Sequence, residues 1–156
     1  MLQSFSRGVR QPTNVEVSQV SRDIGRRLEM YLDRGAGCCF LRNPSVARII
    51  VDNLRHFDPE RYELFAFCVM PNHVHVVMRK NAGWHLDQIL HSWKSYTSKK
   101  AQEVIGRQPF FWQRDYFDHT IRDEEEFWTT IKYVINNPAA GGLKDWPWVW
   151  SKFGLG

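Results

Sequence analysis

Three absences in the sequence each exclude a class of protein. The three cysteines, Cys38, Cys39 and Cys68, form no Cys-x-x-Cys pair, which speaks against a disulfide framework and a cysteine metal site. No apolar run approaches the ~20 residues that a membrane-spanning helix needs. Residues 1–10 lack the apolar core of a secretory signal. We therefore expect a cytoplasmic protein with reduced thiols.

What the chain does contain is compatible with a nucleic-acid partner. Its formal net charge is +4 and its pI is about 9.1, values that also fit an ordinary basic protein. Seven Trp, five Tyr and ten Phe residues are present. Unstacked bases can stack on aromatic faces beside Lys and Arg, although most such rings are expected in the core. With 156 residues, 43% of them hydrophobic, the chain is expected to form one domain.

The hydrophobic periodicity interleaves helices with strands. Helical spacing predicts helices over residues 23–33, from 44 to about 56, over 86–105 with Tyr96 on its inner side, and from 123 to Pro138. β-forming residues predict a hairpin of strands at 62–70 and 73–78 and a strand region at 110–121. The expected fold is α+β, a central antiparallel sheet with helices packed against it. We expect residues 1–22 to be irregular, with a weak strand signal at 15–20, and residues 23–156 to form the single domain.

Two histidines stand two apart on a predicted strand. His73 and His75 follow the Met70-Pro71-Asn72 break. Side chains two apart point to the same face of a strand, so the two imidazoles can bind one divalent metal ion. A bare His-x-His pair is common on surfaces, and two histidines need a third protein ligand. With an oxygen ligand, Mn or Zn would suit the site, as would Mg if phosphate oxygens complete its shell.

A tyrosine and an asparagine lie one turn apart at the end of the last predicted helix. Tyr133 and Asn137 share a helix face, so the Asn137 amide oxygen is a candidate third ligand and Tyr133 a candidate nucleophile. The alternative is a core tyrosine and a helix C-cap asparagine. Tyr96 and Tyr116 are rival nucleophiles, and spacing alone does not choose among the three.

Five segments together resemble the REP-associated tyrosine transposases, within the single-tyrosine HUH group. The segments are FCVMPNHVHVVM at 67–78, ILHSWKSYTSKKA at 89–101, PFFWQRDYFDHTIRDEEEF at 109–127, YVINNPAAGGL at 133–143 and DWPW at 145–148. The resemblance implies a ferredoxin-like sandwich, with His73 and His75 as metal ligands, Asn137 as the third ligand and Tyr133 as the nucleophile. It also implies that Tyr133 cleaves and rejoins single-stranded DNA near hairpins through a 5′-phosphotyrosine, with a divalent Mg or Mn ion.

The sequence departs from this family near its N-terminus. Family members begin with a strand reading like VTFR at the centre of the sheet, and no such strand precedes residue 23. We therefore expect the first strand to be missing or altered. The N-terminus then pairs differently, or a homodimer completes the sheet, or this copy has lost its activity.

Basic and aromatic residues around the expected site are predicted to bind DNA. Lysine and arginine would meet phosphates, and aromatic rings would stack on bases. This set comprises Lys94, Lys99, Lys100, Trp112, Arg114, Tyr116, Arg122, Trp146 and Trp148. The alternative is a solvated helix face for the lysines and core packing for the tryptophans.

Three functions follow from these patterns. The first is a DNA nicking and joining transposase, and the second is a catalytically silent DNA-binding relative with the same fold. The third is a metal-dependent phosphoester hydrolase that uses a metal-bound water. The sequence offers no acidic cluster near the histidines to support the hydrolase.

Overall fold

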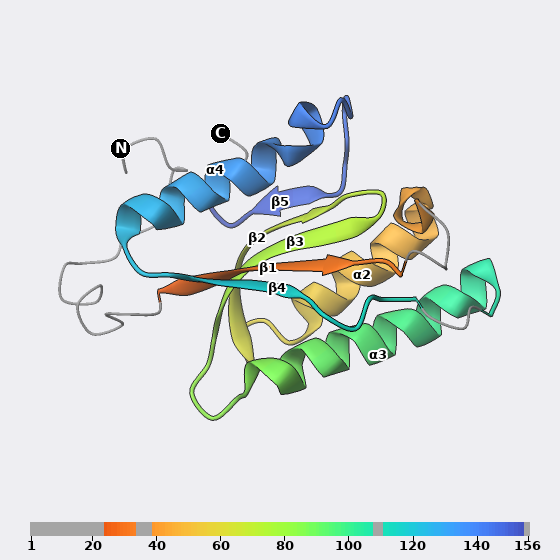
Figure 1. Ribbon diagram of the computed structural model, residues 1–156, viewed down its shortest axis with the longest axis horizontal. Helices are drawn as coiled ribbons and strands as arrows, with labels where there is room; N and C mark the ends of the chain where they lie inside the picture. Colours follow the sequence, from red (N-terminus) through yellow and green to blue (C-terminus); the bar gives the residue numbers. More distant parts are fainter. Residues whose placement is uncertain (1–23, 34–38, 108–110, 155–156) are drawn as a thin grey trace.

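The computed structural model describes residues 24–33, 39–107 and 111–154. Five antiparallel strands form one sheet in the order β4-β1-β3-β2-β5 (Figure 1). The strands are β1 (Gly25–Tyr31), β2 (Tyr62–Val69), β3 (His73–Lys80), β4 (Phe117–Ile121) and β5 (Val149–Ser151). A 3-10 turn, η3 (Phe40–Arg42), and three helices complete the fold: α2 (Pro44–His56), α3 (Leu86–Ile105) and α4 (Glu124–Ala140). The α+β sandwich predicted from the sequence is confirmed.

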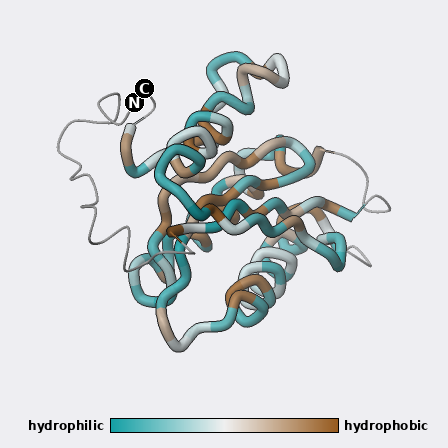
Figure 2. Tube along the Cα trace, turned by 60° about the vertical axis from the view of Figure 1, so that its left-hand side comes forward, coloured by the Kyte–Doolittle hydropathy of each residue, from teal (hydrophilic) through white to brown (hydrophobic). Residues whose placement is uncertain are grey.

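The helices divide between the two faces of the sheet. Helices α2 and α3 pack against one face, and α4 lies across the other (Figure 1). Each face has its own hydrophobic core, one around Leu28, Val76 and Trp93 and the other around Val77, Phe127 and Ile131. Figure 2 shows the hydrophobic stretches gathered along the central strands. The central strands β2 and β3 are therefore buried on both sides along most of their length.

Side-chain caps hold the start of each helix. The Asn43 side chain accepts a hydrogen bond from the Ser45 backbone at 2.9 Å and precedes Pro44, a residue favoured in the first turn. Asp123 caps α4 in the same way, through the Glu126 N–H at 2.8 Å. At the start of α3, His85 and Gln88 form a reciprocal capping box. The helices predicted from residues 44, 86 and 123 are confirmed.

The helix predicted over residues 23–33 is wrong, because this segment forms β1. Ile24, Leu28 and Leu32 fit a helical period, but Leu28, Met30 and Leu32 also alternate with polar residues, and β1 buries that alternating set. The strand lies between β3 and β4 and pairs with both. Long-range pairing has overridden the local helix preference of the residues.

The expected loss of the first strand is therefore also wrong. β1 occupies the interior of the sheet, pairing Leu28 with Val76 on β3 and with Asp118 on β4. A homodimer is no longer required to complete the sheet, and the reason for expecting an inactive copy disappears. Residues 1–22, with the weak strand signal at 15–20, lie outside the described residues.

Smaller differences concern the ends of elements. Helix α4 continues past Pro138 to Ala140, and only the second half of the predicted 110–121 region forms β4. Tyr96, predicted on the inner side of α3, is 49% exposed, whereas Thr97 and Ala101 are buried. The chain after α4 adds the short strand β5 beside β2, which the sequence did not indicate.

No helix of the described residues is long and apolar enough to cross a membrane.

Candidate active site

The two histidines on β3 face α4. Val74 and Val76 alternate with them and point into the core beneath α2 and α3. His75 is 2% exposed and its ring meets the Tyr133 ring edge to face, with the ring centres 5.7 Å apart. The sequence prediction that His73 and His75 share one face of a strand is therefore confirmed.

The ring nitrogens of the pair converge. The Nε2 atoms of His73 and His75 lie 3.0 Å apart. On the outer side of each ring, an oxygen faces Nδ1: Asn72 Oδ1 lies 2.7 Å from His73 Nδ1, and Glu29 Oε1 lies 3.2 Å from His75 Nδ1. Oxygen partners favour the tautomer with the proton on Nδ1, which leaves a lone pair on each Nε2. Two lone pairs directed at one point are an arrangement that a cation stabilises.

Burial keeps both rings in the neutral form that binds metals. It lowers the pKa of His75 to about 4, while the nearby Glu29 carboxylate opposes this shift and the neighbouring His73 adds to it. Burial lowers the pKa of His73 as well, again against the pull of Glu29. At neutral pH the two imidazoles are therefore uncharged and able to act as ligands.

Glu29 and Tyr31 on β1 support the pair from the neighbouring strand. β1 places Glu29 opposite His75 and Tyr31 opposite His73. The Tyr31 hydroxyl donates to Glu29 Oε2 at 2.6 Å, and its ring stacks on His73 with the ring centres 4.9 Å apart. Burial, followed by the hydrogen bond to Glu29, raises the pKa of Tyr31 to about 12. Tyr31 thus stays protonated as a donor, which makes its oxygen a poor nucleophile.

Helix α4 holds Tyr133 over the histidine pair. The side chain is 46% exposed, and the Arg27 guanidinium lies 5.1 Å from the centre of its ring. The other rival tyrosines lie elsewhere: Tyr96 is on α3, beneath the opposite face, and the Tyr116 hydroxyl donates to Asp87 at 2.9 Å. Of the five tyrosines, Tyr31 and Tyr133 contact the histidine pair in the described residues. Tyr133 is the more exposed of the two.

The third metal ligand stays a prediction. Asn137 follows Tyr133 by one turn of α4 and is partly buried, which is compatible with the predicted role. Within residues 24–33, 39–107 and 111–154, no group of three or more His, Cys, Asp or Glu side chains is placed to hold a metal ion. The Asn137 amide oxygen therefore stays the predicted third protein donor beside His73 and His75.

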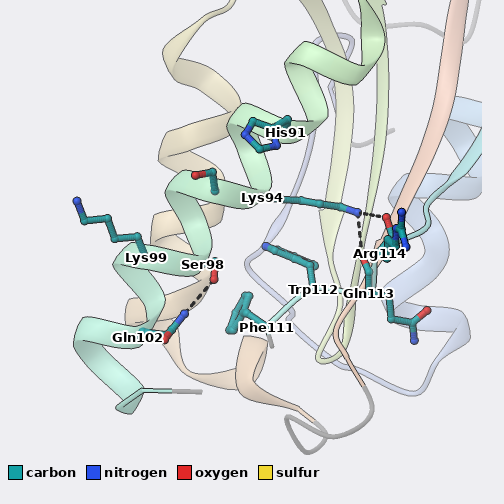
Figure 3. Close-up of a pocket in the computed structure, with 10 residues that line it drawn as sticks. His91, Lys94, Ser98, Lys99, Gln102, Phe111, Trp112, Gln113 and Arg114 are labelled. Carbon is teal, nitrogen blue, oxygen red and sulfur yellow. Dashed lines mark hydrogen bonds between the residues drawn. The ribbon is translucent and has the colours of Figure 1, made fainter. Parts of the chain in front are cut away.

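Four residues predicted to bind DNA line a groove on the opposite side of the sheet. Lys94, Lys99, Trp112 and Arg114 border this groove of about 600 Å³, between α3 and residues 111–114 (Figure 3). Lys94 Nζ donates to the carbonyls of Gln113 and Arg114, and burial lowers its pKa. Lys100, on the same helix, lies 3.7 Å from Glu103. This groove is lined by α3 and residues 111–114, not by α4.

The predicted stacking residues have packing contacts in the structure. The Trp112 indole donates to Thr97 Oγ1 at 2.9 Å, and the Trp146 indole donates to the Val69 carbonyl at 2.7 Å. Trp148 and Tyr116 pack against the core beneath α2 and α3. Arg122 is exposed just before α4. Contacts of all these residues with DNA stay predictions.

The contribution of β1 to the site is hidden in the sequence by the helical period of this segment. Arg27, Glu29 and Tyr31 all lie on the α4 face of the sheet. In the predicted helix the same three side chains would point in different directions. The strict alternation of Arg27, Glu29 and Tyr31 with Leu28, Met30 and Leu32 was the available signal.

Comparison with known proteins gives a family match and two similar folds. A family model described as "Transposase IS200 like" matches residues 47–137. A Haemophilus influenzae protein described as a REP-associated tyrosine transposase is 28% identical over 101 residues, 56% of this chain and 57% of that protein. An uncharacterized protein of the same organism is 24% identical over 112 residues, 56% of this chain and 59% of the relative. The matched region thus spans little more than half the length of these curated relatives.

Two solved structures share the fold. A REP-associated tyrosine transposase bound to a REP hairpin superposes with a TM-score of 0.62 at 20% identity, over 92% of this chain and 81% of that one. A protein of Deinococcus radiodurans R1, described as a transposase, superposes with a TM-score of 0.53 at 17% identity. The match covers 85% of this chain and 95% of that one. The resemblance seen in the sequence is confirmed, and this chain belongs to the IS200-like transposase family.

Proposed function

We propose that this protein is a metal-dependent enzyme that nicks and rejoins single-stranded DNA beside hairpins, with Tyr133 as its nucleophile. The observation that carries the proposal is the contact of the exposed Tyr133 ring with His75, whose Nε2 converges on that of His73. A nucleophile placed beside a cation site is the arrangement that phosphodiester transesterification needs.

The residues present fit a divalent metal ion. The lone pairs on the two neutral Nε2 atoms would hold Mg or Mn, with the Asn137 amide oxygen as the expected third protein ligand. When bound, such an ion polarises a phosphoryl oxygen and offsets the charge that develops on it. The carboxylate of Glu29 faces the outer nitrogen of His75 and so orients that ring.

The reaction requires only an exchange of phosphoester bonds. The Tyr133 oxygen attacks the scissile phosphorus, the bond from phosphorus to the 3′ oxygen breaks, and a 5′-phosphotyrosine forms. The phenol proton leaves to solvent, to which Tyr133 is open, and the released 3′ oxygen takes a proton from water. Attack of another 3′ hydroxyl on the phosphotyrosine reverses the step and restores the phenol. Because bond energy is conserved in the linkage, no nucleotide cofactor is needed.

The alternatives have less support. The silent relative was suggested by a missing strand, and β1 fills that place in the sheet. The hydrolase would need acidic groups around a metal-bound water. Glu29 is a carboxylate close to the pair, but its oxygens face the outer side of His75 and the Tyr31 hydroxyl.

Covalent capture tests the proposal. The protein is mixed with Mn and a pool of labelled single-stranded hairpins from the DNA flanking its gene, and adducts are resolved on a denaturing gel. We expect an adduct with the native protein that Tyr133→Phe abolishes. Tyr96→Phe and Tyr116→Phe serve as matched controls and are expected to retain it. Hairpin binding by the native protein without any adduct would favour the silent relative, and an adduct lost only with Tyr96→Phe would move the nucleophile to α3.

A further inference from the structure

A cation lies between two exposed aromatic rings beside the candidate nucleophile. The Arg27 guanidinium lies 4.8 Å from the centre of the Phe117 ring and 5.1 Å from that of Tyr133. Phe117 is 40% exposed and Tyr133 is 46% exposed. Of the four large hydrophobic side chains that are exposed in the described part of the chain, two therefore meet at this one point.

Strand pairing fixes this arrangement. Phe117 is the first residue of β4 and stands directly opposite Glu29 on β1, so its side chain shares the α4 face with Glu29 and Arg27. Other phenylalanines of this face, Phe65 and Phe127, are 7% and 8% exposed within the core beneath α4. Phe117 is left outside that core, at the open edge of the histidine site.

Within the described residues, the guanidinium of Arg27 has only a long ion-pair contact. Its closest described carboxylate is that of Glu29, with Nη1 and Oε1 3.9 Å apart. Oε1 of Glu29 lies closer to His75, and Oε2 accepts the Tyr31 hydroxyl. Its neighbour Arg26 differs, because Arg26 Nη1 forms a 2.7 Å ion pair with Asp118. A guanidinium beside the nucleophile, whose nearest described carboxylate oxygen is 3.9 Å away, is suited to bind a phosphate.

We propose that Arg27 and Phe117 form a nucleotide subsite next to Tyr133. This inference rests on the function proposed above and assigns its substrate contacts. The Phe117 ring stacks on the base adjacent to the scissile phosphate, and the Arg27 guanidinium binds a phosphate of the same nucleotide. Aromatic stacking accepts every base, so the subsite requires an unpaired base and favours the larger purine rings. Only a single strand can present its base in this way.

The first test combines a protein change with a DNA change. Abasic nucleotides are placed singly on either side of the cleavage position, and covalent adduct formation is measured at subsaturating DNA. Phe117→Ala is expected to lower the rate on intact DNA by about 5- to 150-fold, because stacking on a protein ring contributes about 1–3 kcal/mol per base. At one of the two positions, an abasic nucleotide should lower the rate of the native protein by a similar factor. On that abasic strand, Phe117→Ala should cause no further loss of rate. Phe117→Trp should restore the rate on intact DNA.

The second test does not depend on the covalent step. In a Tyr133→Phe background, 2-aminopurine replaces the base at the position identified by the abasic scan, or each flanking base in turn. Stacking should quench its fluorescence on binding, and Phe117→Ala should abolish the quenching. Tyr96→Ala, which removes an exposed ring from α3, is the matched control and should leave it intact. Arg27→Gln should weaken binding and flatten its salt dependence, whereas Arg26→Gln should not.

The two tests separate this subsite from the proposed function. Quenching that depends on Phe117, in a protein that forms no adduct, would keep the subsite and reject the chemistry. An adduct whose rate falls equally with Phe117→Ala on intact and abasic strands would reject the subsite and keep the chemistry. Unchanged quenching in the Phe117→Ala variant would also overturn the subsite.

Discussion

On β1 and β3, alternate side chains divide between an apolar face beneath α2 and α3 and a polar face beneath α4. Leu28 and Val76, which are paired across the strands, are fully buried in the first core. Glu29 and His75, the next pair along the ladder, are buried on the second face and carry the candidate chemistry. The same short strands therefore supply both the hydrophobic core and the candidate site. Consecutive residues serve one or the other, because side chains alternate between the two faces of a strand.

The polar groups remain in place because the apolar face holds the strands in register. The apolar face fixes the register, since a shift by one residue would place Leu28 and Val76 beneath α4 and the histidines in the other core. With the register fixed, Asn72 Oδ1 lies 2.7 Å from His73 Nδ1 and Glu29 Oε1 lies 3.2 Å from His75 Nδ1, while the Tyr31 hydroxyl holds the other oxygen of Glu29. Removing side chains from one face at a time should therefore separate the loss of activity from the loss of stability.

Removing the two histidines from the polar face should reduce activity more than any other change. The double variant His73→Ala, His75→Ala should lower the rate of adduct formation about a thousandfold or more. A metal ion that polarises a phosphoryl oxygen contributes several kcal/mol, and each 1.36 kcal/mol is a factor of ten in rate. Adduct formation is followed in Mn with and without a chelator. A variant that forms adducts within tenfold of the native rate would contradict a role for the histidines.

The next effect is on the apolar face. Leu28→Ala should lower the free energy of unfolding by about 2–5 kcal/mol, because Leu28 is fully buried in the α2 and α3 core. Denaturant titration measures the change. At a temperature where the variant is folded, its rate of adduct formation should match that of the native protein. A rate that falls as far as it does in the histidine variant would show that the two faces are not separable.

A smaller effect is expected from the support of His75. Glu29→Gln keeps the size of the side chain but removes its charge, and should weaken Mn binding about 10- to 100-fold, as is usual for partners that orient a metal ligand. Isothermal calorimetry with Mn measures this directly. Glu63→Gln is the matched control, since Glu63 pairs with Arg79 and Lys152 away from the histidines. Equal Mn affinities for the two variants would remove the orienting role of Glu29.

The smallest effects belong to the caps of the helices that cover each face. Asn43→Ala on α2 and Asp123→Ala on α4 should each lower the free energy of unfolding by about 1 kcal/mol, because each leaves one backbone N–H without its side-chain acceptor. Neither should change the adduct rate of the folded protein, since Tyr133 lies more than two turns from Asp123. A rate loss confined to Asp123→Ala would indicate that α4 positions Tyr133 less firmly than the packing implies.

The sequence predicted those parts of the fold in which local pattern and tertiary environment agree. Helices α2 and α3 have capping signals and an apolar face, and α3 spans the predicted residues 86–105. β2 and β3 join through a tight turn after Met70, as the Pro71-Asn72 break indicates. β1 could not be separated from a helix locally, because its six-residue alternation competes with strong helix formers and is decided by pairing with distant strands.

Only part of the candidate site was predictable from the sequence. The pairing of His73 with His75 was predictable from spacing, because the two residues stand two apart on one strand, whereas Tyr133 was distinguished from its rivals only by the resemblance. Glu29 and Arg27 were not predictable, since their roles depend on β1 entering the sheet between β3 and β4. Phe117 likewise becomes part of the site only through its pairing with Glu29.

The decisive measurement identifies the residue that carries the DNA. The covalent adduct formed with a single-stranded hairpin is digested with protease and nuclease, and the modified peptide is sequenced by mass spectrometry. We predict a nucleotide linked through its 5′ phosphate to Tyr133. A nucleotide on Tyr31, Tyr96 or Tyr116, or a linkage through a 3′ phosphate, would contradict the account.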